Sequence, residues 1–125
     1  MYRIEKIGEN QFYIKALGTF PPQVAEKFVN KFEEKTMEMK KFSVIIDGVD
    51  FILLNLKSFK IILEFLKKNN EKLIRSAYII SKNPPLDKEF QILLDRADSP
   101  KRKIVKTLDE AKEWIGVKKI IIKKE

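Results

Sequence analysis

The chain has 125 residues, a length typical of one domain, and its 44% hydrophobic and 35% charged residues describe a globular protein with a charged shell. It contains neither cysteine nor histidine, which excludes disulfides, thiolate metal sites and catalytic triads with a histidine base. The net charge of +8 is uneven, because residues 101–125 carry +5 of it, and such a basic end either attracts nucleic acid or anionic lipid or is simply solvated surface.

Two short strands and a helix are predicted in the first third of the chain. Residues 2–7 and 12–18 have the apolar alternation of strands and flank the turn signal Gly8-Glu9-Asn10, so an antiparallel hairpin is expected. Pro21-Pro22 then opens a helix whose apolar side chains recur at helical spacing to about Met39.

The middle of the chain alternates between strands and helices. Residues 42–47 are β-branched and short, as in a buried strand, and Asn55 is a suitable cap for the amphipathic helix that follows. Residues 74–81 form the fourth predicted strand. Pro84-Pro85 opens a third helix, which Asp98-Ser99-Pro100 ends.

The last predicted strand, residues 101–106, is followed by a capped helix. Thr107 and Glu110 have the spacing of a capping box, and Gly116 is suited to the position just after the helix. Residues 1–116 are therefore expected to form a single domain. Residues 117–125, VKKIIIKKE, form a basic and apolar tail that either pairs as an edge strand, in its own sheet or in a homodimer, or is disordered.

These elements predict an α/β fold of the order β-β-α-β-α-β-α-β-α. The sheet is expected to be mixed and five-stranded, with an N-terminal antiparallel hairpin, the remaining strands parallel and four helices mainly on one face. The second face would then be partly open. Polar residues that interrupt otherwise apolar strands, such as Lys15 and Arg75, are compatible with this arrangement.

This element order resembles that of the STAS domain family, which includes anti-sigma factor antagonists, cytoplasmic domains of sulfate transporters and SEC14-like bacterial relatives. The resemblance covers residues 2 to about 116. It depends on the order of elements, on the stretch VIIDGVDFILLNLKSF and on the closing VKTLDEAKEWI. It implies a STAS-like fold and a small cytoplasmic domain that meets a protein partner.

The resemblance also locates a site in the loop before the second helix. Anti-sigma factor antagonists carry an aspartate there, followed by a phosphorylatable serine and a small residue. This chain has Leu53 near the aspartate position, Asn55 near the serine and Leu56 in the small position, so the usual phosphorylatable serine is missing. Ser58, one turn into the helix, is the remaining candidate phosphosite, whereas Asn55 is expected to be an ordinary helix cap.

The other polar constellations are less specific. Asp47 and Asp50 follow a strand and could hold a divalent ion, but their spacing matches no metal loop and such aspartates more often cap turns. We therefore predict no metal site, no cofactor and no catalytic residue. The chain also lacks a glycine-rich phosphate loop and the aromatic-basic motif of an RNA platform, so no specific nucleic-acid binding is expected.

The leading hypothesis is a non-catalytic protein-interaction or regulatory module. Its predicted partner-binding residues are Phe51, Leu53, Leu54, Asn55 and Ser58, since an exposed FILL sequence would form an apolar patch. The alternatives are a binder of a lipid or other apolar small molecule and a weak electrostatic binder of nucleic acid. The N-terminus lacks the apolar region of a signal peptide and no apolar run reaches the ~20 residues of a membrane span, so a cytoplasmic location without a transmembrane segment is expected.

Overall fold

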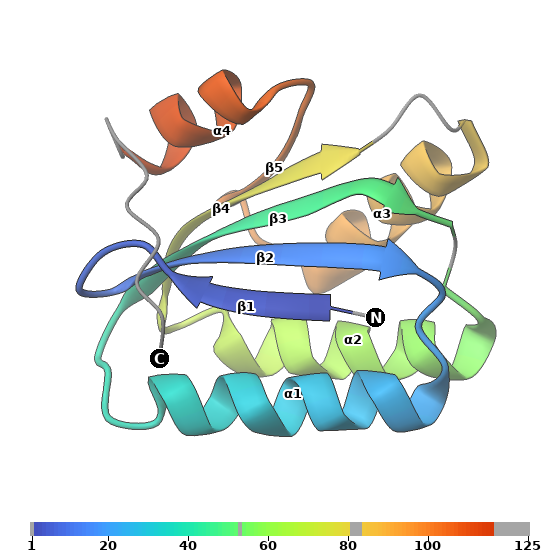
Figure 1. The fold of residues 1–125 in the computed structure, drawn as a ribbon, viewed down its shortest axis with the longest axis horizontal. Helices are drawn as coiled ribbons and strands as arrows, with labels where there is room; N and C mark the ends of the chain where they lie inside the picture. Colours follow the sequence, from blue (N-terminus) through green and yellow to red (C-terminus); the bar gives the residue numbers. More distant parts are fainter. Residues whose placement is uncertain (1, 53, 81–83, 117–125) are drawn as a thin grey trace.

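The computed structural model describes residues 2–52, 54–80 and 84–116, and shows a mixed sheet with helices on both faces (Figure 1). Its strands are β1 (Tyr2–Lys6), β2 (Gln11–Gly18), β3 (Phe42–Phe51), β4 (Leu73–Ile80) and β5 (Arg102–Val105). Its helices are α1 (Pro22–Thr36), α2 (Leu56–Asn69), α3 (Pro84–Ala97) and α4 (Leu108–Ile115). The predicted element order is confirmed, and the tail 117–125 lies outside the described residues.

The strands lie side by side in sequence order. β1 and β2 form the predicted antiparallel hairpin, with Ile4 opposite Ile14, and β2 to β5 are parallel. Right-handed crossovers between neighbouring parallel strands place their helices on one face. Accordingly, α1, α2 and α3 cover the same side of the sheet and bury the main hydrophobic core.

The fourth helix lies on the opposite face (Figure 1). α4 follows the last strand that the structure describes and connects no pair of the described parallel strands, so the crossover rule does not fix its side. A second, smaller core forms beneath it from residues of β3, β4, β5 and α4, including Ile45, Ala77 and Ile115. Three helices thus share one face, and the described residues cover the second face only in part.

One strand is longer than predicted. The sequence pattern ends the third strand at Asp47 because Gly48 is typical of a turn, but β3 continues to Phe51. β2 provides the partner for this extension, with Leu17 opposite Asp50 and Gly18 opposite Phe51 beyond an irregularity in register. The β3–α2 connection is consequently short and starts at the carboxyl edge of the sheet, where α1, α2 and α3 all begin.

Helix ends follow the predicted chemistry. The Asn55 side chain accepts a hydrogen bond from the Ser58 amide at 2.8 Å, and Thr107 accepts one from the Glu110 amide at 3.1 Å. Gly116 adopts the left-handed conformation after α4, with φ of 80°. Within the described residues, no helix is both long and apolar enough to span a bilayer.

Candidate functional site

The structure separates the predicted partner-binding residues into buried and exposed groups. Phe51 and Leu54 are buried in the main core, and Ser58 is 0% exposed. Asn55 is exposed and caps α2, whereas Leu53 lies outside the described residues. An exposed FILL patch is therefore wrong for Phe51 and Leu54, because both side chains turn inward beneath the helices that begin at this edge.

Ser58 has a structural contact at the position predicted for a phosphosite. Its hydroxyl donates a hydrogen bond to the Phe20 carbonyl, which joins the first turn of α2 to the β2–α1 connection. A phosphate on this fully buried oxygen would displace that contact and the packing around it. Modification of Ser58 remains a prediction, and it would require α2 to move away from Phe20.

Sequence reasoning placed Ile52 in the exposed FILL patch, as the structure does, but missed the exposed side chains of Val49 and Leu56 on either side of it. Val49, Ile52 and Leu56 are large hydrophobic residues exposed to solvent within eight consecutive positions, and Leu56 is 70% exposed. We call these three residues the β3 exit surface. Residues 51–54 are all apolar and Leu56 starts an amphipathic helix, so the sequence pattern alone could not decide which of these side chains turn inward.

A glutamate of α3 holds the same loop. Glu89 Oε1 accepts a hydrogen bond from the Leu54 amide at 2.8 Å. Burial raises the pKa of the Glu89 carboxyl above its ordinary value, although the bond from the Leu54 amide opposes the shift. Sequence spacing gives no signal for this contact, because it joins residues 35 positions apart.

An apolar cavity lies between the sheet and the helices α1, α2 and α3. Its volume is about 60 Å³, and the side chains of Phe20, Phe51, Leu54, Phe90 and Tyr78 contribute to its lining. Pockets for drug-sized ligands usually measure ~300–1,000 Å³. The cavity as observed is therefore too small for a lipid chain.

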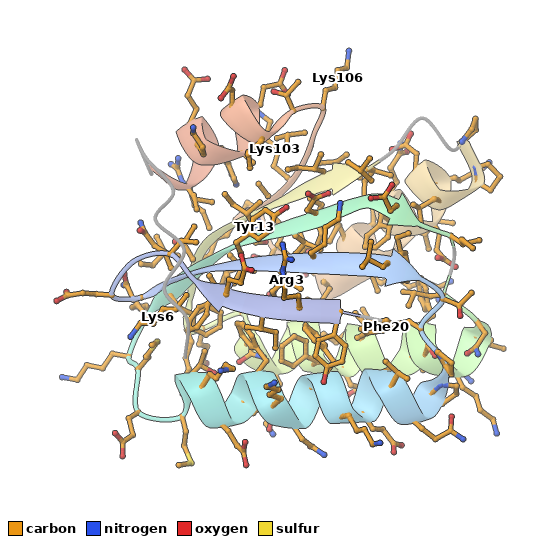
Figure 2. The ribbon with its side chains drawn as sticks, in the orientation of Figure 1. Arg3, Lys6, Tyr13, Phe20, Lys103 and Lys106 are labelled. Carbon is orange, nitrogen blue, oxygen red and sulfur yellow. The ribbon has the colours of Figure 1, made fainter. Side chains whose placement is uncertain are left out.

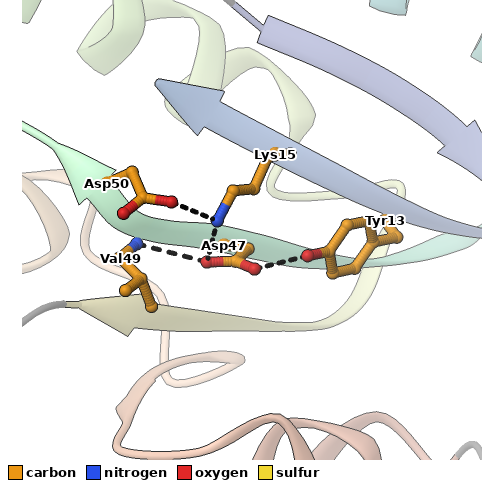
Figure 3. A network of polar contacts seen from close by, with 5 residues as sticks. All are labelled: Tyr13, Lys15, Asp47, Val49 and Asp50. Atoms are coloured by element: carbon orange, nitrogen blue, oxygen red, sulfur yellow. Dashed lines mark hydrogen bonds and ion pairs between the residues drawn. The ribbon is translucent and has the colours of Figure 1, made fainter. Parts of the chain in front are cut away.

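The open part of the second face carries a polar network on β2 and β3 (Figure 3). The Lys15 ammonium lies 3.3 Å from an Asp47 oxygen and 3.0 Å from an Asp50 oxygen, and the Tyr13 hydroxyl donates a hydrogen bond to Asp47. Asp47 also accepts a bond from the Val49 amide at 3.2 Å. The Asp47 carboxylate thereby links Tyr13 and Lys15 of β2 to the backbone of Val49 near the end of β3.

Tyr13 and Lys15 both keep their protons in this network. Burial and the hydrogen bond to Asp47 raise the pKa of the Tyr13 phenol, so it remains protonated and acts as a donor. Burial alone would lower the pKa of Lys15, but its bonds and charge interactions with Asp50 and Asp47 outweigh that effect and raise it. At neutral pH both groups are therefore protonated, and both donate to the Asp47 carboxylate.

The Asp47 and Asp50 pair is bridged by a side-chain cation. The Lys15 ammonium contacts both carboxylates, in the place where an ion between them would have to lie. Within residues 2–52, 54–80 and 84–116, no cluster of three or more acidic residues has the geometry of a metal site.

Basic residues near α4 surround one aromatic ring. The Arg75 guanidinium lies 4.4 Å and the Lys103 ammonium 5.1 Å from the Trp114 ring centre. The Trp114 indole N–H donates to the Ser76 carbonyl at 2.9 Å, and Arg75 donates to the Trp114 carbonyl at 3.1 Å. These cations therefore fix α4 to the sheet, which reduces their availability to an external anion.

Comparisons with known proteins identify the fold. No protein-family model matches the sequence, and no curated protein matches it significantly. The structure is similar to that of an uncharacterised DUF3478-family protein with a SpoIIAA-like fold from Shewanella loihica PV-4, with a TM-score of 0.71, 18% identity and coverage of 90% of this chain and 92% of that chain.

A second similar structure is the anti-sigma factor antagonist SpoIIAA in its unphosphorylated form. The TM-score is 0.65 at 13% identity, and the match covers 93% of this chain and 98% of that chain. The chain therefore has a SpoIIAA-like fold, and the prediction of a STAS-like domain architecture is confirmed.

Proposed function

We propose that the chain is a non-catalytic regulatory module of STAS type that acts in the cytoplasm by binding a protein partner. The similar fold of SpoIIAA, an anti-sigma factor antagonist, supports this class of function. The absence of histidine and the protonated Tyr13 and Lys15 fit a domain that carries out no proton transfer. The missing serine at the Asn55 position implies regulation by some means other than phosphorylation there.

The observation that carries the proposal is the β3 exit surface. Ile52 is 53% exposed and Leu56, four positions later, is 70% exposed, and exposed apolar side chains that lie close together commonly mark contact surfaces. This surface lies at the carboxyl edge of the parallel strands, which is where open α/β sheets commonly place their binding sites.

A matched pair of leucines tests the proposal. Leu56 and Leu108 are each the first residue of a helix, and both are exposed, at 70% and 40%. Replacing either by glutamate introduces the same charge at the same helical position, where the helix dipole tolerates it. Affinity capture from native lysate should lose its specific protein with Leu56→Glu and keep it with Leu108→Glu. Equal capture by both variants contradicts partner binding at this surface.

The two alternatives gain less support from the geometry. A lipid would need the cavity of about 60 Å³ to expand several-fold. Native mass spectrometry that found a co-purifying apolar ligand would favour this alternative. Electrostatic binding of nucleic acid would have to rely on cations such as Arg75 and Lys103, which already contact Trp114, and would weaken steeply with salt.

A further inference from the structure

β1 presents a free backbone edge. In the part of the chain that the structure describes, its only strand neighbour is β2, as Figure 1 shows. The Ile7 amide donates to the Gln11 carbonyl at 2.9 Å, and hydrogen-bonded pairs alternate along an antiparallel ladder. The backbone groups of Arg3 and Glu5 therefore point toward β2, and those of Tyr2, Ile4 and Lys6 point outward.

Two charged side chains of opposite sign lie on one face of this edge, and one of them, Glu5, is largely buried. Arg3 and Glu5 lie on the α4 side of the sheet, and Figure 2 shows Arg3 there with Tyr13. Arg3 Nε is 2.7 Å from Glu5 Oε1, and their side chains are 62% and 14% exposed. The second oxygen of Glu5 is buried and has no hydrogen-bond partner among the described residues. A buried acceptor without a donor is costly, so Glu5 is unlike the solvated lysines that usually protect an edge strand.

We propose that β1 pairs antiparallel with β1 of a second copy of this chain, so that two sheets join across a two-fold axis at Ile4. In this register, Ile4 faces the partner's Ile4, and Arg3 faces the partner's Glu5. The same contact is repeated on the other side of the axis. The outward backbone groups of Tyr2, Ile4 and Lys6 then find partners, and the exposed guanidinium of Arg3 lies opposite the partner's Glu5 carboxylate, with which it forms an ion pair.

Charge selects this register from its neighbours. Only shifts by two residues keep outward-pointing backbone groups opposite one another. One such shift places Arg3 opposite the partner's Arg3, and the other places Glu5 opposite the partner's Glu5. Like charges directly opposite each other destabilise a strand pair, whereas opposite charges stabilise it. The sequence Arg-Ile-Glu is therefore self-complementary in one antiparallel arrangement.

The interface is short, since β1 has only five residues. Stable complexes usually bury ~1,200–2,000 Å² in total, so we expect a dimer that dissociates in the micromolar range or above. The contribution of exposed charges also makes the dimer weaker at high salt.

Sedimentation equilibrium on the full chain tests the pairing. The unaltered chain should form dimers as its concentration rises from about 10 µM to about 1 mM. Arg3→Glu places two acidic residues opposite two acidic residues, and Glu5→Arg does the same with basic residues, so each should weaken the dimer at least about tenfold. The double variant, and an equimolar mixture of the two single variants, restore opposite charges and should dimerise again.

Hydrogen exchange gives an independent signature of the edge. On dimerisation the amides of Ile4 and Lys6 should become protected, whereas those of Arg3 and Glu5, already bonded to β2, should change little. Circular dichroism of each variant checks that it is folded. A chain that stays monomeric throughout overturns the proposal. A dimer that persists in both single variants does so too, because its interface would then lie elsewhere, residues 117–125 included.

Discussion

At the scale of single residues, burial divides the β3–α2 connection into two roles. Phe51, Leu54 and Ser58 hold the connection onto the body of the protein, and Val49, Ile52 and Leu56 remain exposed. The two sets alternate within ten positions of sequence. A substitution at a buried position of this segment should therefore change stability. A substitution at a neighbouring exposed position should change the surface instead.

Lysine substitutions separate these two roles. Leu54→Lys places an ammonium in the core and should lower the free energy of unfolding by roughly 3 kcal/mol, as large changes at buried leucines do. Ile52→Lys, at a position 53% exposed, should change it by less than about 0.5 kcal/mol. Urea denaturation measures both. Similar losses in the two variants would mean that Leu54 is not buried as described.

Glu89 makes stability depend on pH in an unusual direction for a carboxylate. Burial raises its pKa in the folded protein, so the folded state holds the proton more tightly than the unfolded chain does. The contribution of Glu89 to the free energy of unfolding therefore falls as the pH rises from the ordinary glutamate pKa through the raised pKa, and it returns on acidification. Glu89→Gln, neutral at every pH, should flatten this part of the stability profile.

Thermal melts across the acidic range measure the effect of Glu89. Glu26→Gln, on the exposed face of α1, serves as the control and should leave the profile as in the unaltered chain. If the stability of Glu89→Gln changes with pH as steeply as that of the unaltered chain, a group other than Glu89 binds the proton responsible.

At the scale of elements, local chemistry fixes helix starts more firmly than strand ends. Asn55 caps α2 and Thr107 caps α4 as the sequence predicts, because a cap depends on residues three positions apart. The predicted end of β3 at Asp47 is wrong, because Gly48, a residue typical of turns, continues the strand opposite Ile80 of β4. The extension to Phe51 depends on pairing with β2, which is more than thirty residues away. The exposure of Val49, which lies in this extension, was missed for the same reason.

The cap of α4 can be tested by itself. Thr107→Ala removes the acceptor of the Glu110 amide and should cost about 1 kcal/mol, whereas Thr107→Ser keeps the hydroxyl and most of the stability. Chemical denaturation of the two variants compares them directly. A Thr107→Ala variant as stable as Thr107→Ser would indicate that packing alone holds the first turn of α4.

At the scale of the whole molecule, the sheet separates two cores of unequal size. The main core contains Phe32, whose ring packs against four other aromatic rings from β2, α1, β3 and α2. The second core lies beneath α4, an eight-residue helix that Trp114 ties to β4. A short helix over a small core opens at a lower free-energy cost than the rest of the fold.

Native-state hydrogen exchange should therefore report two levels of opening. Trp114→Ala removes the indole bond to Ser76 and the contacts with Arg75 and Lys103, and should speed exchange in α4 while leaving α1 and α2 close to their original rates. Phe32→Ala, which removes a fully buried ring, should cost roughly 4 kcal/mol and speed exchange in every element. If Trp114→Ala accelerates exchange equally throughout the chain, α4 unfolds only together with the whole molecule. The core beneath α4 would then open no more easily than the main core.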